Sequence, residues 1–427
     1  MRRIRIGIIG AGAATEWSIL PVLSGPDIVA PPDTGAWWGR RAPSTSDIYY
    51  QAPARPEVVA LADEDGARAE RVANMARVRG VYSDWRTMLR EVELDAVLCT
   101  ASPRVAGDVA VAAGAAVKWL WLAGPPAGSA AAALQLARDL QGRTLRVWCS
   151  RALRRAAAHR AAWRLIERGH IGAVAALALR WGAPLHTTER TEKSQSLAST
   201  QDATDAPHLA SSYAALDLLL HFAAGSHRRE RANEETLLDD SASANGARVV
   251  ADEFGGATNV WLRLADGVTA TALFSGAESW SAPLPRLEVC GTQGRWLVCE
   301  AGRRLWLHQP RETAHLLEPP GMIAHITAAN VLGVAEDLKA FLAACAGESE
   351  PFTNRQQTGQ SEAREPALFD AVQPLALLEA INTALNSGEP AHVEAWDTVS
   401  TSSAGFVAAG ETPRPVTALP STLPLPL

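Results

Sequence analysis

The sequence predicts an α/β protein that begins with a doubly wound parallel sheet and continues into a second α/β part. Over the first 150 residues, apolar runs alternate with helical patterns, which is typical of parallel strands connected by helices. From about residue 158 the pattern changes to mostly short strands with a few helices. The chain has 427 residues, of which 47% are hydrophobic and 20% charged, so it is long and apolar enough for two domain-sized cores.

The first part is expected to contain five buried strands, each a continuous apolar run. They are Ile4–Ile9, Val58–Ala62, Ala96–Thr100, Val117–Ala123 and Thr144–Cys149. Helical patterns separate them at Glu64–Arg77, Trp85–Arg90, Val105–Ala116 and Ser129–Leu140. The stretch 24–56 interrupts this alternation. Because it is rich in Pro, Gly, Ser and Trp, it is predicted to be a long inserted loop.

The second part is expected to open with a helix over residues 158–168 that ends at Gly169. Strands follow at Val174–Trp181, Arg248–Phe254, Asn259–Leu264, Val268–Phe274, Arg286–Val289, Arg295–Val298 and Arg303–His308. Residues 291–294 (GTQG) indicate a hairpin connection, and two late helices are expected at Val334–Ala344 and Phe369–Ser387. Polar loops are predicted over 184–205 and 347–364. We therefore place domains at 1–150 and 151–410, with a Pro-rich, disordered tail at 411–427.

Charge and cysteine content exclude several classes of function. The net charge of −6 offers no basic field for nucleic acid or an anionic membrane. The five cysteines are widely spaced and form no metal-binding pattern, which favours reduced thiols and a cytoplasmic protein without a metal site. Because no run of 18 or more apolar residues is present, no membrane span is expected.

A glycine-rich turn follows the first strand and precedes a helix. Gly10 permits a tight turn, and Gly12 lets the backbone approach a pyrophosphate at the helix N-terminus, where Ala13 and Ala14 follow. Thr15 occupies the third Gly/Ala position of the dinucleotide-binding fingerprint. The turn predicts a dinucleotide site; the alternative is a plain strand–helix connection.

An acidic residue closes the second strand, where a dinucleotide-binding fold places the ligand of the ribose hydroxyls. Asp63 takes this position, and the inserted loop explains its long distance from the glycines. A carboxylate here repels a 2′-phosphate and therefore favours NAD over NADP. The alternative is a surface Asp63 that caps the helix beginning near Glu64.

Several ordered motifs together resemble the Gfo/Idh/MocA oxidoreductases. They are GIIGAGAATEWSILPVL, PEVVALADEDGARAERVA, VYSDWRTMLREVELDAVLCTASP, RLIERGHIGAV, LEVCGTQGRWLV and VAEDLKAFLAA. The resemblance implies an N-terminal Rossmann domain and a C-terminal α/β domain on an open, mostly antiparallel sheet whose face closes over the nicotinamide. It also implies a cofactor contact from Thr100, Ala101 and Ser102, which stand where the family has a Thr-Pro loop.

The same resemblance shows that the usual catalytic residues are replaced. The family's Glu-Lys-Pro falls on Ala123, Gly124 and Pro125, so the catalytic Lys position is a glycine. In ASSYAALD, the counterpart of Asp-x-Gly-x-His-x-x-Asp, the His position is Ala214 and only Asp217 is kept. The remaining positions of these signatures are Ala210 for Asp, Ser212 for Gly and Ala106 for the His after the Thr-Pro loop.

Other side chains are candidates for the missing proton transfer. Asp217 and His221 share a helix face at i, i+4 spacing and form a candidate acid/base couple, although His221 in an apolar helix also fits a packing role. Tyr213, next to the lost His position, is a candidate proton donor. Further candidates lie nearby in sequence, namely Lys193, His186 and His208.

Three functions follow from these expectations. The first is an NAD(P)-dependent oxidoreductase that transfers hydride to or from a small-molecule substrate, a sugar, cyclitol or related polyol. The second is a catalytically inactive pseudoenzyme that binds dinucleotide as a sensor or complex subunit. The third is cofactor-assisted elimination or hydrolysis of a glycoside. The resemblance also implies a homo-oligomer formed through the outer face of the C-terminal sheet.

Overall fold

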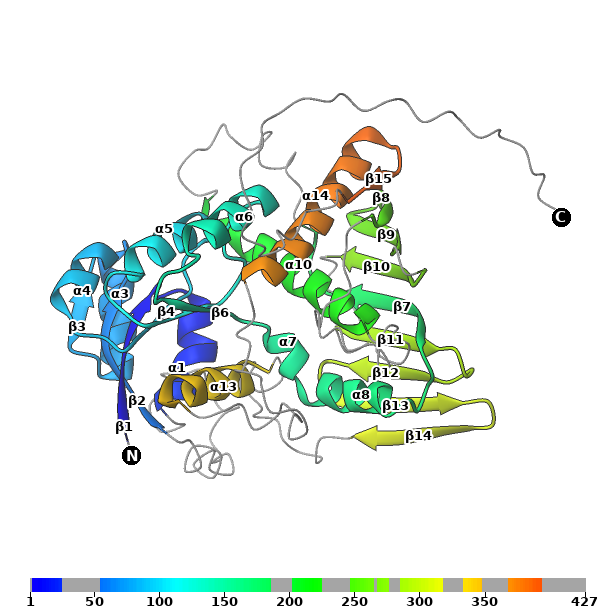
Figure 1. Ribbon diagram of the computed structural model, residues 1–427, viewed down its shortest axis with the longest axis horizontal. Coiled ribbons are helices and arrows are strands. Elements are labelled where there is room, and N and C mark those ends of the chain that lie inside the picture. Colours follow the sequence, from blue (N-terminus) through cyan, green and yellow to red (C-terminus); the bar gives the residue numbers. More distant parts are fainter. Residues whose placement is uncertain are drawn as a thin grey trace. The chain divides into compact units, whose positions relative to one another are not determined.

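Two sheets organise the chain in the computed structural model (Figure 1). The structure describes residues 2–24, 54–185, 202–224, 246–264, 267–275, 285–317, 333–347 and 368–393. All of them belong to one compact unit, Met1–Ala395. The predicted tail at 411–427 and the greater part of each predicted loop lie outside the described residues, and the domain boundaries at residues 150 and 410 stay predictions.

The first sheet is parallel and doubly wound, as predicted. It has six strands in the order β3-β2-β1-β4-β5-β6. These are β1 (Arg2–Ile9), β2 (Ala54–Ala62), β3 (Gly80–Tyr82), β4 (Ala96–Cys99), β5 (Trp119–Leu122) and β6 (Arg146–Cys149). All four residues of both β4 and β5 are buried, which explains their continuous apolar runs. The short strand β3 was not anticipated, because its three residues carry too little pattern.

Helices connect these strands, and short polar side chains start most of them. They are α3 (Gly66–Ala76), α4 (Trp85–Glu91), α5 (Pro103–Ala113) and α6 (Ala130–Asp139). Asp65, Asp84 and Ser129 accept backbone N–H bonds at the starts of α3, α4 and α6.

The first helix contains a π-helical stretch, η1 (Thr15–Ile19), which runs into α1 (Leu20–Ser24). Pro21 explains this irregularity, since it has no N–H and its ring crowds the carbonyl one turn earlier. The turn widens, and the Leu20 N–H donates to the Thr15 carbonyl instead.

The second sheet is mixed and mostly antiparallel. Its nine strands follow the order β14-β13-β12-β11-β7-β10-β9-β8-β15. They are β7 (Val174–Trp181), β8 (Arg248–Phe254), β9 (Ala257–Arg263), β10 (Thr269–Ser275), β11 (Arg286–Gly291), β12 (Trp296–Glu300), β13 (Arg304–Gln309), β14 (Glu312–Leu317) and β15 (Ala391–His392). Only β7 and β10 pair in parallel. The predicted hairpin connection joins β11 to β12, and Gly169 adopts a positive φ of 73° as a helix terminator.

The remaining helices of the described residues are α7 (Ala152–Arg155), α8 (Ala157–Glu167), α10 (Asp202–Ala223), α13 (Val334–Ala346), η3 (Leu368–Ala371) and α14 (Val372–Ser387). The loop predicted over 184–205 extends too far, because α10 already begins at Asp202. Helix α13 packs on the first sheet although it lies late in the sequence. Its Phe341 makes edge-to-face contacts with Trp119 and Trp148.

Candidate functional site

The glycine turn begins where β1 ends, at Gly10. Its φ is +99°, and a Cβ there would lie 2.5 Å from Thr100 Oγ1 and 3.0 Å from the Ala101 nitrogen. Only glycine fits this position. The Gly10 N–H donates to the Ala62 carbonyl over 2.8 Å, so the turn is held between the carboxyl ends of β2 and β4. A turn at this place in an open parallel sheet is where such folds bind ligands.

The space at Gly12 is open. A Cβ built on it meets no atom within 4 Å, while Ala13 and Ala14 are exposed at the start of the helix. The first N–H groups of a helix have no acceptor within the helix, and together with the helix dipole they attract anions. The turn therefore fits the pyrophosphate of a dinucleotide.

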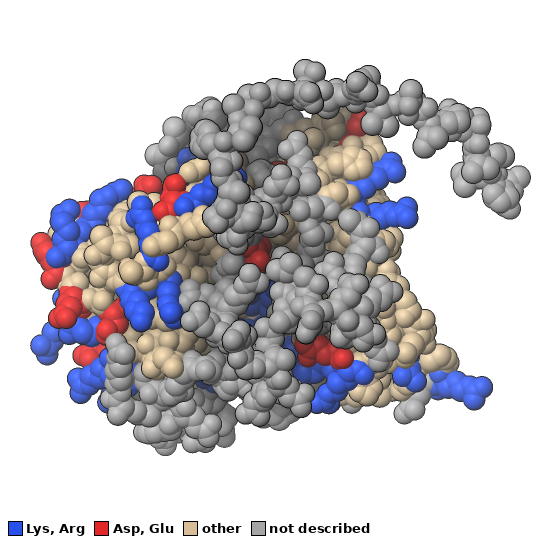
Figure 2. All heavy atoms as spheres, in the orientation of Figure 1, with Lys and Arg blue, Asp and Glu red and all other residues tan. Residues whose placement is uncertain are grey.

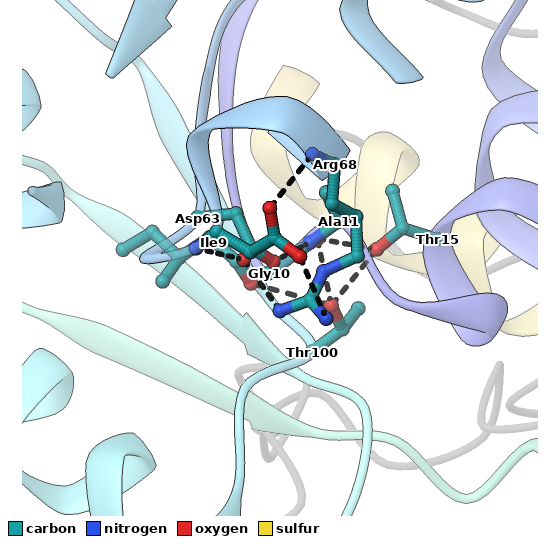
Figure 3. Close-up of polar contacts among 8 residues, drawn as sticks. Ile9, Gly10, Ala11, Thr15, Asp63, Arg68 and Thr100 are labelled. Atoms are coloured by element: carbon teal, nitrogen blue, oxygen red, sulfur yellow. Dashed lines mark hydrogen bonds and ion pairs between the residues drawn. The ribbon is translucent and has the colours of Figure 1, made fainter. Parts of the chain in front are cut away.

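Thr15 stabilises the glycine turn by hydrogen bonds from the first helix. It is fully buried, and its hydroxyl donates to the Gly10 carbonyl over 2.6 Å. The same oxygen lies 2.8 Å from Thr100 Oγ1, which is also 3.0 Å from the Gly10 carbonyl oxygen (Figure 3). Thr15, where the dinucleotide-binding fingerprint has Gly or Ala, therefore adds hydrogen bonds within the turn. Ser102, two residues after Thr100, is the N-cap residue of α5.

Asp63 lies beside this turn at the end of β2 and is buried. Its Oδ2 accepts the Ala11 N–H over 2.6 Å. Its Oδ1 accepts the Asp65 N–H over 2.9 Å and Arg68 Nη2 over 2.6 Å (Figure 3). The residue that caps α3 is Asp65, so the surface-cap alternative for Asp63 is wrong. Arg68 is a member of the site that the sequence analysis missed.

The tip of β5 contacts α10 directly. A Cβ on Gly124 would lie 3.4 Å from the Cβ of Ala210, an ordinary van der Waals contact. Gly124 and Ala210, which the resemblance aligns with the family's Lys and Asp, therefore lie next to each other. Ala106 is buried in α5, and Ala214 lies one turn after Ala210 on α10.

The predicted couple of Asp217 and His221 is joined through an arginine. Asp217 is buried and accepts Arg154 Nε over 2.7 Å and Nη2 over 2.6 Å. Arg154 Nη1 lies 3.4 Å from His221 Nδ1, and the His221 ring stacks on Trp163 with centroids 4.1 Å apart. The i, i+4 spacing does place both residues near one cation, but the ion partner of Asp217 is Arg154.

Tyr213 lies on α10, one turn before Asp217. It is 2% exposed, and its hydroxyl has no hydrogen-bond partner among the described residues. Burial and the Asp217 carboxylate raise the Tyr213 pKa well above its ordinary value, so the phenol keeps its proton. Arg151 lies in the same charged cluster, with Nη2 3.4 Å from Asp370 Oδ2 and Nε 3.9 Å from Asp217 Oδ1.

Some candidates cannot be placed. His186 and Lys193 lie outside the described residues, and of His208 only its backbone position on α10 is described. No sequence signal pointed to Arg151 or Arg154, because their carboxylate partners come from distant segments. Across the described ranges, no group of three or more His, Cys, Asp or Glu side chains is arranged to hold a metal ion. Nor does any helix within them have the length and apolar character needed to cross a membrane.

Comparison with known proteins confirms the resemblance drawn from the motifs. Residues 4–150 match the GFO_IDH_MocA family, described as an oxidoreductase family with an NAD-binding Rossmann fold. No curated protein matches the chain in sequence. The first part of the chain is therefore the Rossmann fold of this oxidoreductase family.

Solved structures extend the likeness of fold beyond residues 4–150. Levoglucosan dehydrogenase in complex with NADH and levoglucosan has a TM-score of 0.64 and 15% identity, covering 92% of this chain and 100% of that one. An oxidoreductase from Agrobacterium radiobacter in complex with NAD+, L-tartaric acid and magnesium has a TM-score of 0.61 and 14% identity, covering 91% and 98%. An oxidoreductase domain protein from Kribbella flavida has a TM-score of 0.64 and 16% identity, covering 92% and 100%. At these identities the likeness shows the fold.

Proposed function

We propose that the protein is an NAD(P)-dependent oxidoreductase that transfers hydride to or from a sugar, cyclitol or related polyol. The observation that carries this proposal is the turn Gly10–Gly12, with its positive φ at Gly10 and its open space at Gly12. When bound, the nicotinamide accepts or supplies the hydride, and the protein positions the partners and manages the proton. The sugar ligand of the levoglucosan dehydrogenase structure supports the substrate class.

Tyr213 is the best candidate for proton management in this proposal. Its hydroxyl is protonated and has no hydrogen-bond partner among the described residues, so it is available to donate to a developing alkoxide. Asp217 and Arg154 form a bidentate ion pair, so Asp217 acts by holding Arg154 and, through it, His221. His221 remains the alternative proton carrier.

A second candidate function is a dinucleotide-binding pseudoenzyme. The contact between the Gly124 tip and Ala210 favours it, because both partners lack the groups that perform chemistry in related proteins. In this case the Gly10–Gly12 turn binds cofactor for sensing or assembly, without turnover.

A homo-oligomer and a cytoplasmic location complete the proposal. Val250 and Trp261 are cross-strand neighbours and are 39% and 44% exposed. Trp296 is 39% exposed. The strand register places it on the same face, through Cys290, Ala176, Thr269 and Arg263 in turn. Val250 and Trp261 form a contiguous exposed apolar pair, with Trp296 further along the same face, and we propose that a second copy of this chain covers this face.

The experiment that separates the two functions measures binding and turnover on one preparation. NADH is titrated against the protein while tryptophan fluorescence is followed, and a panel of sugars and polyols is then tested for NAD(P) reduction. Binding with turnover supports the oxidoreductase, whereas binding without turnover supports the pseudoenzyme. Failure to bind at millimolar cofactor contradicts both. If a double variant, Gly124→Lys with Ala214→His, gains turnover that the wild type lacks, the pseudoenzyme is the correct assignment.

A further inference from the structure

The carboxylate expected to select NAD is already engaged by a cation of the chain itself. A carboxylate accepts about four hydrogen bonds, two on each oxygen. Asp63 Oδ1 has two donors, the Asp65 N–H and Arg68 Nη2, and Oδ2 has one, the Ala11 N–H. One acceptor position is left for a ribose hydroxyl, on Oδ2. While Arg68 stays in place, Asp63 cannot accept both ribose hydroxyls as the usual NAD-selecting carboxylate does.

Arg68 brings charge and free donors to this position. Its side chain is 39% exposed, and its guanidinium points at the Asp63 carboxylate from α3 (Figure 3). Its Nε has no hydrogen-bond partner among the described residues, and Nη1 is 3.7 Å from Asp65 Oδ2. A guanidinium has five N–H donors in a planar fork that matches phosphate oxygens. One N–H of Arg68 donates to Asp63. The other N–H groups of the guanidinium remain as donors for an anion bound at the ribose.

We infer that Arg68 is a specificity-determining residue that lets this site accept NADP(H) as well as NAD(H), as a ligand of the 2′-phosphate. The inference rests on the proposed function, since it concerns the same dinucleotide. The Arg68 charge cancels that of Asp63, so the carboxylate no longer repels a 2′-phosphate. Glu64 and Asp65 are exposed and keep the surroundings acidic, although solvent screens them. We therefore expect the site to bind NADP(H) about as well as NAD(H), without a strong preference for the 2′-phosphate.

The test compares the affinities of NADH and NADPH for the intact chain. Both nucleotides are titrated against wild type, Arg68→Gln and Arg68→Lys, with binding followed by nucleotide fluorescence. Arg71→Gln is the matched control, because Arg71 lies on the same helix, is 53% exposed and pairs with a carboxylate, Glu16, over 2.8 Å. Thermal unfolding of each variant shows that it is folded.

In the wild type, the two dissociation constants are expected to agree within about tenfold. Arg68→Gln is expected to weaken NADPH relative to NADH by about 10- to 100-fold, the loss typical of a hydrogen bond to a charged group. Arg68→Lys should lie between, and Arg71→Gln should leave the ratio unchanged. A wild type that binds NADH but not NADPH, or an unchanged ratio in Arg68→Gln, overturns the inference and leaves the proposed function standing. A chain that binds neither nucleotide contradicts both.

Discussion

Burial sets the charge state of several individual residues of this protein. Asp63, Asp217 and Asp337 are each buried and each paired with an arginine. Breaking such a pair leaves an uncompensated charge, which costs more than the pair itself contributes. Burial also raises the pKa of Cys99 and Cys149 to about 12, so both remain protonated thiols. Nucleophilic chemistry by either cysteine is therefore not expected.

His159 makes stability depend on pH. Burial lowers its pKa from 6.5 to about 4, while Nδ1 lies 2.7 Å from the Leu153 carbonyl oxygen. Because the unfolded chain binds a proton below pH 6.5 and the folded chain does not until about pH 4, stability is lost as pH falls through this window. The loss amounts to about 3 kcal/mol from this residue.

Urea unfolding between pH 7 and pH 4 measures this contribution. His159→Asn keeps a donor near the Leu153 carbonyl and does not titrate, so its curve of unfolding free energy against pH should be flatter than that of the wild type by the same amount. Parallel curves for the two proteins would contradict the assignment.

At the scale of elements, helix α13 holds the carboxyl-terminal half of the first sheet. Asp337 is 1% exposed and accepts the indole N–H of Trp121 over 2.9 Å and of Trp148 over 3.3 Å. Arg155 Nε donates to the same carboxylate over 3.0 Å. One aspartate thus fixes β5, β6 and α7 to α13. Both tryptophans are buried and serve packing.

Removing this acceptor is expected to destabilise the protein strongly. Asp337→Leu leaves two indole N–H groups and a guanidinium without their acceptor, at a cost of about 3–5 kcal/mol in unfolding free energy. The neighbouring Glu336→Gln is the matched control, since Glu336 is half-exposed and pairs with Arg160 and Lys339 at the surface. The control should lose under about 1 kcal/mol. Equal losses in the two variants, measured by denaturant unfolding, would refute the special role of Asp337.

At the scale of the whole molecule, the two sheets differ in surface character. On the face drawn in Figure 2, acidic and basic side chains are interspersed over α3 and α4, whereas the second sheet shows more uncharged surface. The proposed oligomer buries the exposed face of the second sheet that carries Val250, Trp261 and Trp296.

Charge placed in this face should prevent assembly. Trp261→Glu is expected to convert the proposed oligomer to monomer, because a buried unpaired carboxylate opposes association. Val111→Ser, on α5 and 42% exposed, tests whether any loss of exposed apolar surface has the same effect, and it should not. Light scattering after size exclusion gives the mass. A wild type that is monomeric at all concentrations refutes the oligomer.

Much of the fold follows from local sequence, and less of the site does. The strands of the first sheet other than β3 were predictable because each contains an apolar run, which β4 buries on both faces, and Gly10 because its turn tolerates no side chain. The ion pair between Arg68 and Asp63 was not predicted. An arginine near the start of a helix looks like a surface residue in sequence, until the direction of the helix is known. The Arg154–Asp217 pair joins residues 63 positions apart, and no periodicity links them.

The central claim is that the Gly10–Gly12 turn binds a dinucleotide. Isothermal titration of NADH into wild type, Gly12→Asp and Gly128→Asp tests it most directly. Both glycines have open space for a Cβ, so neither substitution clashes within the protein, and only Gly12 faces the expected phosphate. Wild type and Gly128→Asp should bind equally, while Gly12→Asp should bind about 100-fold more weakly or not at all. Equal binding by all three proteins, or no binding by the wild type, would contradict the claim.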